Sequence, residues 1–239
     1  MFRFYALRIL KDYLGHIILI GLPVVLISIM VVINQEVSQV DDVGPVALFI
    51  GIIYIIMFQG FGSAYTFEGL EHDFFKPFKD RLRAAPVHPM RFVVMNILFS
   101  IVISFLQSLV LLAYVVIVFG SNIPKVGFVI LVLFLGVILV QLMASVCILV
   151  FKKASKAQAF ITIYIIISMI IAGFFFPLPE TGFTIFLSRY SSPLAWTHLA
   201  SYGFIDGVMK DAFIGLILMG TTIATFTLLV FRLSRRVIQ

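Results

Sequence analysis

The sequence has little charge, one cysteine and one tryptophan, and these scarcities limit what the protein can be. Only 12% of its 239 residues are charged, whereas 62% are hydrophobic. Soluble domains have roughly 45–50% apolar and about 25% charged residues, so the composition excludes an ordinary soluble protein. A single cysteine, Cys147, also excludes an intrachain disulfide or a cysteine-based metal centre. The composition predicts a polytopic membrane protein.

Ionisable groups are missing from the long apolar runs. Six runs lack Asp, Glu, Lys and Arg, at residues 17–33, 45–66, 92–119, 126–151, 157–176 and 212–231. A carrier driven by a proton or sodium gradient usually holds such a residue inside its spans, which argues against that class. The four histidines lie at or beyond the ends of the runs, so a serine protease built on Ser63 is also disfavoured.

Motifs for catalysis and metal binding are equally scarce. There is no GxxxxGK[ST] phosphate-binding loop. Glu71, His72 and Asp73 are adjacent, so a helix would point them in different directions, and we expect a solvated patch there. We therefore expect no catalytic residue, no metal site and no cofactor in this chain. We also expect that the chain is not an enzyme.

The six apolar runs are long enough to cross a bilayer, because a core of roughly 30 Å needs about 20 helical residues. Continuous runs favour helices over a barrel. Fourteen of the seventeen basic residues lie before the first run, between the second and third, between the fourth and fifth, and after the sixth. The positive-inside rule then makes both termini cytoplasmic, and no nucleic acid is needed to explain the basic balance. We expect an all-α integral membrane protein with one transmembrane domain, residues 1–239.

Both the first residues and the loop between the second and third spans have amphipathic character. MFRFYALRILKDYLG, residues 1–15, predicts an interfacial helix, or alternatively an extension of the first span. In the loop, Phe74, Phe78 and Leu82 recur every four residues, and a helix is expected over about Phe78–Ala84. Such a helix suits docking on a soluble partner; the alternative is that it lies on the lipid surface. The predicted docking residues are Phe74, Phe78, Lys79, Arg81, Leu82 and Arg83.

The segment between the fifth and sixth spans is long yet apolar. Two prolines end the fifth helix, an i, i+3, i+4, i+7 apolar face follows, and Ser192-Pro193 then provides an N-cap and a first-turn proline. This pattern predicts a re-entrant helical hairpin at the outer side, or alternatively an ordinary folded loop. The residues that define the hairpin are Pro177, Pro179, Phe183, Phe186, Pro193 and Trp196.

Polar but uncharged residues stand within the spans among many of the 26 phenylalanines. They are candidates to line a path for an apolar or amphipathic cargo. The alternative is that the glutamines form hydrogen bonds between helices. The candidates are Tyr54, Gln59, Gln107 and Gln141.

Several segments resemble one family. The chain is similar to ATP-binding-cassette (ABC) exporter permeases of the second type in its span count, its topology and three segments. The segments are RLRAAPVHPMRFVVMNIL (81–98), AGFFFPLPETG (172–182) and SSPLAW (191–196). The resemblance implies a homo- or heterodimer of permeases in which the loop between spans two and three is a coupling helix that docks a cytoplasmic ATPase. ATP and Mg²⁺ would then be bound by that ATPase.

The sequence therefore predicts a permease in the plasma membrane of a bacterium, in contact with lipid, that exports a toxin or antimicrobial peptide or a hydrophobic drug. Two other transport roles stay open, a permease for lipid-linked glycans and the membrane substrate-capture subunit of a vitamin importer. An intramembrane enzyme or a structural scaffold is a further alternative.

Overall fold

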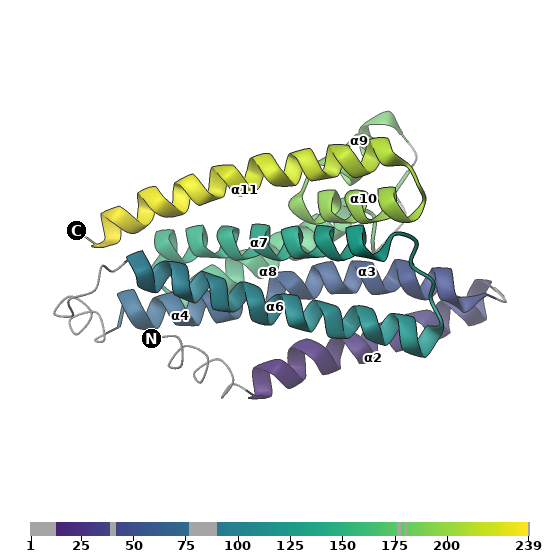
Figure 1. Cartoon of the computed structure of the whole chain (residues 1–239), viewed down its shortest axis with the longest axis horizontal. Coiled ribbons are helices and arrows are strands. Elements are labelled where there is room, and N and C mark those ends of the chain that lie inside the picture. Colours follow the sequence, from purple (N-terminus) through teal and green to yellow (C-terminus); the bar gives the residue numbers. More distant parts are fainter. Residues whose placement is uncertain (1–12, 39–41, 77–89, 176–177, 180, 239) are drawn as a thin grey trace.

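The computed structural model describes residues 13–38, 42–76, 90–175, 178–179 and 181–238, and in this part of the chain all regular structure is α-helical (Figure 1). The helices are α2 (Tyr13–Ser38), α3 (Val43–Phe61), α4 (Ala64–Phe74), α6 (Met90–Phe119), α7 (Val126–Phe151), α8 (Ala154–Ile171), α9 (Gly182–Tyr190), α10 (Pro193–Ile205) and α11 (Met209–Ile238). Six stretches are long and apolar enough to cross a membrane, with α3 and α4 forming one of them. This confirms the predicted all-α membrane class.

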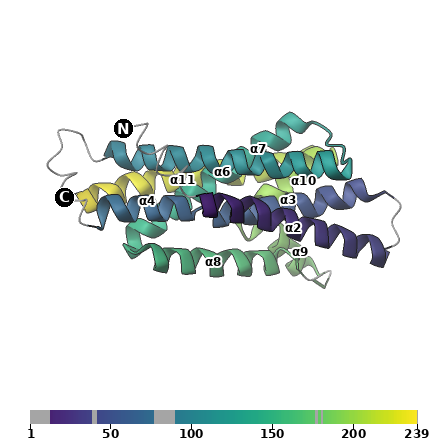
Figure 2. The same cartoon turned by 90° about the horizontal axis from the view of Figure 1, so that it is seen from below.

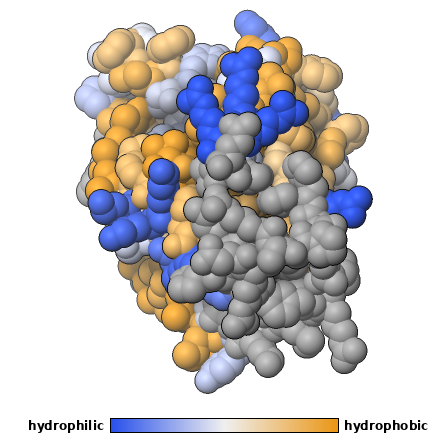
Figure 3. Space-filling view, turned by 90° about the vertical axis from the view of Figure 1, so that its left-hand side faces the viewer, coloured by the Kyte–Doolittle hydropathy of each residue, from blue (hydrophilic) through white to orange (hydrophobic). Residues whose placement is uncertain are grey.

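The long helices run up and down, so that their connections gather at two ends (Figures 1 and 2). The ends of α4 and α11, the start of α6 and the turn between α7 and α8 lie together; we call this the basic end. The α2–α3, α6–α7 and α10–α11 connections lie at the opposite end. Figure 3 looks onto the basic end and shows hydrophilic side chains gathered there.

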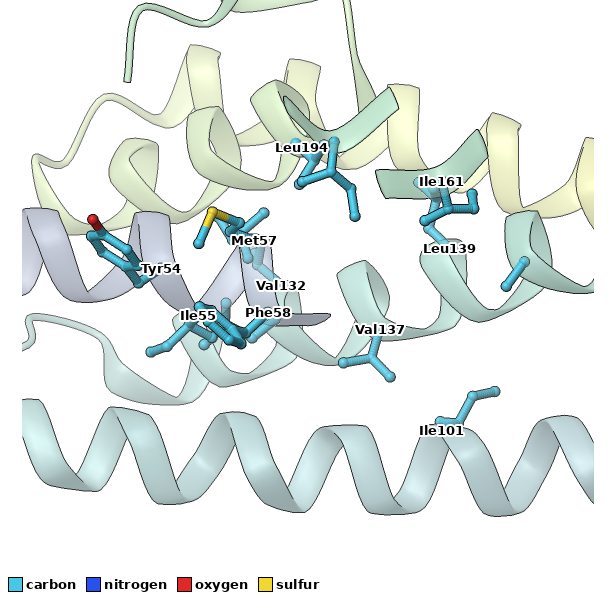
Figure 4. Packing of buried hydrophobic residues seen from close by; sticks show 14 of the residues in the cluster. Tyr54, Ile55, Met57, Phe58, Ile101, Val132, Val137, Leu139, Ile161 and Leu194 are labelled. Atoms are coloured by element: carbon cyan, nitrogen blue, oxygen red, sulfur yellow. The ribbon is translucent and has the colours of Figure 1, made fainter. Parts of the chain in front are cut away.

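Helix α3 lies at the centre of the bundle. Residues 50–60 are all buried, and α3 contacts α2, α6, α7, α8 and α10. Figure 4 shows side chains from several of these helices in one apolar cluster, among them Met57, Val132 and Leu194. A helix with apolar residues on every side is expected to be enclosed, and this one is.

The second span is interrupted between α3 and α4, at the sequence GFGSA (60–64). The glycines let other helices come close. A Cβ at Gly60 would lie 2.4 Å from the Ile165 Cδ1 atom of α8, and a Cβ at Gly62 would lie 2.9 Å from the Ser104 Oγ atom of α6. Small residues at helix contacts commonly serve this purpose in membranes.

The outer helices present apolar side chains outward. In the most apolar windows of α2 and α11, only 17% of residues are buried inside the chain. Ile17 and Ile217 are each more than 60% exposed. Such faces suit contact with lipid tails or with another membrane helix.

Several predicted features lie outside the described residues. These are nearly all of the amphipathic segment 1–15, the coupling helix over about 78–84 with Phe78, Lys79, Arg81, Leu82 and Arg83, and Pro177 of the outer hairpin.

Candidate functional site

A seam of uncharged polar side chains runs between α3, α4, α6 and α7. On α6, Asn96, Ser100, Ser104 and Ser108 recur every four residues, and all four are buried. A four-residue repeat places them on one face of the helix, toward the centre of the bundle. We call this group the polar seam, completed by Gln59, Ser63, Thr66 and Gln141.

Gln141 on α7 is bonded to two other helices, α4 and α6, and to the turn between α3 and α4. Its Oε1 atom accepts a hydrogen bond from the Thr66 hydroxyl at 2.6 Å. Its Nε2 atom donates to the Ser104 Oγ atom at 2.9 Å and to the Gly62 carbonyl at 3.3 Å. The last bond matters because the break between α3 and α4 weakens the local backbone pairing of that carbonyl, which Gln141 restores.

Gln59 on α3 makes a second set of contacts. Its Nε2 atom donates to the Ser108 Oγ atom at 3.1 Å and to the Leu133 carbonyl of α7 at 3.2 Å. Its Oε1 atom has no partner among the described residues, and the same holds for the polar side-chain atoms of Ser63, Asn96 and Ser100. Polar groups in this state need water or a changed arrangement, so the polar seam is the least satisfied part of the interior.

Gln107 forms a third polar contact, nearer the start of α2. Its Nε2 atom donates to the Tyr65 hydroxyl at 3.2 Å and lies 3.1 Å from the His16 Nδ1 atom. Tyr65 and His16 are themselves 2.8 Å apart. Three helices, α2, α4 and α6, are joined here.

Gln59, Gln107 and Gln141 are buried, and their side chains form hydrogen bonds between helices, as the alternative interpretation of the glutamines expects. Whether they also line a path for cargo stays a prediction. Tyr54 differs, because it borders a cavity of about 290 Å³ between α2, α3 and the end of α8.

At the basic end, Glu71 ties α4 to the start of α8. Its Oε1 atom accepts a hydrogen bond from the Ala154 backbone N–H at 3.0 Å, and its Oε2 atom lies 3.1 Å from the Lys76 Nζ atom. The N–H groups of a first helical turn lack partners inside the helix, so a carboxylate is favourable there. Lys153, at the N-cap of α8, provides no side-chain cap of its own.

Two predictions at this end need correction. Asp73 is 0% exposed and lies 3.2 Å from the His72 Nδ1 atom, so the patch is not uniformly solvated. Phe74 ends α4 and is only 5% exposed, because it packs in the main core. It is therefore not available as a docking anchor here. Phe78 and Leu82, the other two predicted apolar anchors, lie outside the described residues. No group of three or more His, Cys, Asp or Glu residues in the described chain could hold a metal ion.

The outer segment folds as two short helices. Ser192 caps α10 by accepting a hydrogen bond from the Ala195 N–H at 3.2 Å, and Pro193 follows in the first turn, as the sequence predicts. Trp196 donates from Nε1 to the Tyr190 carbonyl at 2.8 Å and so fixes the corner between α9 and α10. Figure 1 shows α10 alongside α7 and α11 rather than beyond their ends.

The remaining hairpin residues lie on or before α9. Phe183 and Phe186 are 71% and 60% exposed, and α9 has no buried residue. Pro179 precedes α9, and its carbonyl accepts a hydrogen bond from the Thr181 N–H at 2.9 Å. The pattern of apolar residues therefore predicts a helix correctly, but Phe183 and Phe186 point away from the rest of the chain, whereas Leu187 and Tyr190 are partly buried.

Together, the six apolar helices, the uncharged polar seam and the basic end define a multi-pass membrane protein. A family model for ABC-2 type transporters matches residues 2–200. The chain belongs to this family, and it is the membrane-embedded permease subunit of an ABC transporter that works with ABC ATPase subunits. The search of curated proteins gives no match.

Proposed function

We propose that this permease is an exporter of the plasma membrane, with both termini in the cytoplasm and the ATPase docked at the basic end. ATP and Mg²⁺ are bound by the ATPase, and this chain performs no catalytic step. A second permease protomer completes the path. The cargo is amphipathic or hydrophobic, a peptide toxin, an antimicrobial peptide or a drug.

The distribution of charge supports this orientation. Eight described basic residues lie at the basic end, just after α4, at the start of α6, in the α7–α8 turn and the first turn of α8, and in the last turns of α11, and three lie at the opposite end. The eight are Lys76, Arg91, Lys152, Lys153, Lys156, Arg232, Arg235 and Arg236. Basic residues concentrate on the cytoplasmic side of membrane proteins.

The observation that carries the proposal is the bond between Glu71 and Ala154. The segment expected to dock the ATPase follows α4 almost directly, and Glu71 lies in the last turn of α4. A displacement of that segment is passed to α8 through this bond and to the centre of the bundle through α3 and α4. ATP-driven movement therefore has a short mechanical route into the membrane.

The polar seam supports an amphipathic cargo. It holds glutamine, serine, threonine and asparagine, with no fixed charge to select an inorganic ion. A lipid-linked glycan remains the alternative cargo. Membership of the ABC-2 family favours a permease over the substrate-capture subunit of a vitamin importer.

The docking claim is tested by co-purification with the ATPase. The double variant Phe78→Asp, Leu82→Asp should lose the ATPase while still entering the membrane, because two charged residues replace its apolar anchors. Val208→Asp is the matched control, since Val208 is an exposed apolar residue at the opposite end and should change nothing. Unchanged co-purification of the double variant would refute docking at this loop.

The cargo is tested in inside-out vesicles that contain both proteins. ATP should drive uptake of a fluorescent amphipathic peptide, and an ATPase without its phosphate-loop lysine should abolish this uptake. If the vesicles accumulate lipid-linked glycans alone, the peptide or drug assignment is wrong and the glycan alternative holds.

A further inference from the structure

A cavity of about 330 Å³ opens at the end of the bundle opposite the basic end. It lies between α3, α9, α10, the beginning of α11 and the segment after α8. This volume is within the range of pockets that bind small molecules, about 300–1,000 Å³. We call it the outer aromatic pocket, and the residues that give it its chemistry are Phe49, Phe174, His198, Tyr202, Asp206 and Asp211.

Four rings from three parts of the chain form its wall. The His198 ring is stacked on Tyr202 with centroids 4.7 Å apart, and it lies 4.6 Å from the Phe174 ring. Phe49 meets both His198 and Tyr202 edge-on, at 5.5 and 5.4 Å. The faces of aromatic rings carry negative potential and attract cations, organic ammonium groups in particular.

The charged groups of the pocket leave one negative charge in excess. Asp211 is paired with the Arg189 guanidinium at 3.3 Å. Asp206 also lines the pocket, is exposed, and has no ion pair among the described residues. Burial lowers the pKa of His198, so its ring is neutral and does not offset Asp206. One guanidinium thus faces two carboxylates.

An unpaired nitrogen of His198 is an independent indication that the pocket binds a ligand. Its Nε2 atom is buried and has no hydrogen-bond partner in the described chain, although His198 borders the cavity. A buried polar atom without a partner costs about 1–3 kcal/mol, which a polar group of a ligand would recover.

We propose that the outer aromatic pocket binds an organic cation with an apolar body, a protonated amine, from the outer side. The rings receive the cationic group and its apolar body, and Asp206 provides the counter-charge. An inorganic cation such as Ca²⁺ takes six to eight oxygen ligands, and the described residues hold no group of three or more His, Cys, Asp or Glu that could bind a metal ion. An anion would meet Asp206. The site involves neither ATP nor the docking loop, so its failure would leave the proposed export function standing.

The chain has a built-in reporter for this site. Trp196 is its single tryptophan and lies on α10 between the pocket residues Ala195 and His198. Full-length permease in dodecyl maltoside, a detergent without ammonium groups, is titrated with benzylammonium while Trp196 emission is followed, and calorimetry checks the affinity. Benzyl alcohol and benzenesulfonate are the neutral and anionic comparison ligands.

We expect saturable binding of the cation, with the two comparison ligands bound at least tenfold more weakly. Asp206→Asn and Tyr202→Leu should each weaken cation binding by about tenfold. Tyr202→Phe keeps the ring and should bind the cation as the parent protein does. Comparing it with Tyr202→Leu separates the effect of losing the aromatic ring from that of a disturbed fold. Glu36→Gln and Phe186→Leu, matched changes outside the pocket, should also leave binding unchanged.

The proposal is overturned if the parent protein shows no saturable binding, or if benzyl alcohol binds as tightly as the cation. It is also overturned if Asp206→Asn and Tyr202→Leu both bind the cation normally. Gel filtration and the unliganded Trp196 emission establish that each variant is folded before the comparison is made.

Discussion

The Glu71 carboxylate and the Ala154 backbone N–H are 83 residues apart in sequence and 3.0 Å apart in space. Their hydrogen bond closes the basic end of the bundle between α4 and α8. The side chain acts as a helix cap supplied by a different helix, so the beginning of α8 depends on the position of α4.

Removing this carboxylate should loosen the first turn of α8. Loss of a cap costs about 1 kcal/mol, so Glu71→Ala should speed amide exchange in residues 154–158 by about fivefold. Lys76→Ala is the control, because it removes an exposed ion pair of little worth and keeps the bond to Ala154. Hydrogen-exchange mass spectrometry of the permease in micelles measures both. Equal exchange in Glu71→Ala and the parent protein would contradict the cap.

Gln141→Leu should destabilise the bundle. The variant keeps the size of the side chain but removes the hydrogen bonds of Gln141 to Thr66 and to the Gly62 carbonyl, at a cost of about 0.6–2 kcal/mol. Gln158→Leu is the matched change, since in the described chain the Gln158 amide donates within its own helix, to Thr162. Thermal unfolding in micelles should rank Gln141→Leu clearly below Gln158→Leu; the reverse order would mean that the polar seam does not hold the helices together.

Gly203→Ala should push α10 away from α11. A Cβ at Gly203 would lie 2.4 Å from the Ala212 backbone nitrogen, and backbone atoms cannot move aside as a flexible side chain can. We expect a loss of about 1–3 kcal/mol and a shift in Trp196 emission. Gly220→Ala serves as the control, because among the described residues no atom beyond the adjoining turns of α11 lies within 4 Å of its added Cβ, and the helix gains slightly. A neutral Gly203→Ala would show that the two helices are less tightly packed than described.

Thiol labelling tests the orientation of the bundle. Lys153→Cys and Lys210→Cys place exposed thiols at the basic and the opposite end. In intact cells a membrane-impermeant maleimide should label position 210 and spare position 153, which should react after lysis. The native Cys147 is buried and serves as the background in the parent protein. Labelling of position 153 in intact cells would reverse the proposed topology.

Apolar runs locate the helices well but not their ends. The run 126–151 coincides with α7, whereas 212–231 covers only the middle of α11, which extends from Met209 to Ile238. Arg232, Arg235 and Arg236 are good helix formers that hydropathy excludes from a span, so the helix continues where the apolar run stops. Similarly, the run 45–66 conceals the break after Phe61, because glycine and serine count as neither charged nor strongly polar.

Fewer features of the candidate site than of the fold could be predicted from the sequence. Local rules found the Ser192 cap and Pro193 at the start of α10, since both act within one turn. The bond between Glu71 and Ala154 and the ring cluster around His198 join residues far apart in the chain, and no local pattern marks them. Phe74 shows the opposite failure: its spacing matched an amphipathic stripe, but tertiary packing took it into the core.

The enclosure of α3 separates the interior of the permease from its surroundings. Residues 50–60 are all buried inside the chain, so neighbouring helices stand between them and the bilayer. Membrane thickness and lipid composition therefore act first on α2 and α11. A spectroscopic label on α3 would respond to rearrangement of the permease itself and remain insensitive to the lipid that carries it.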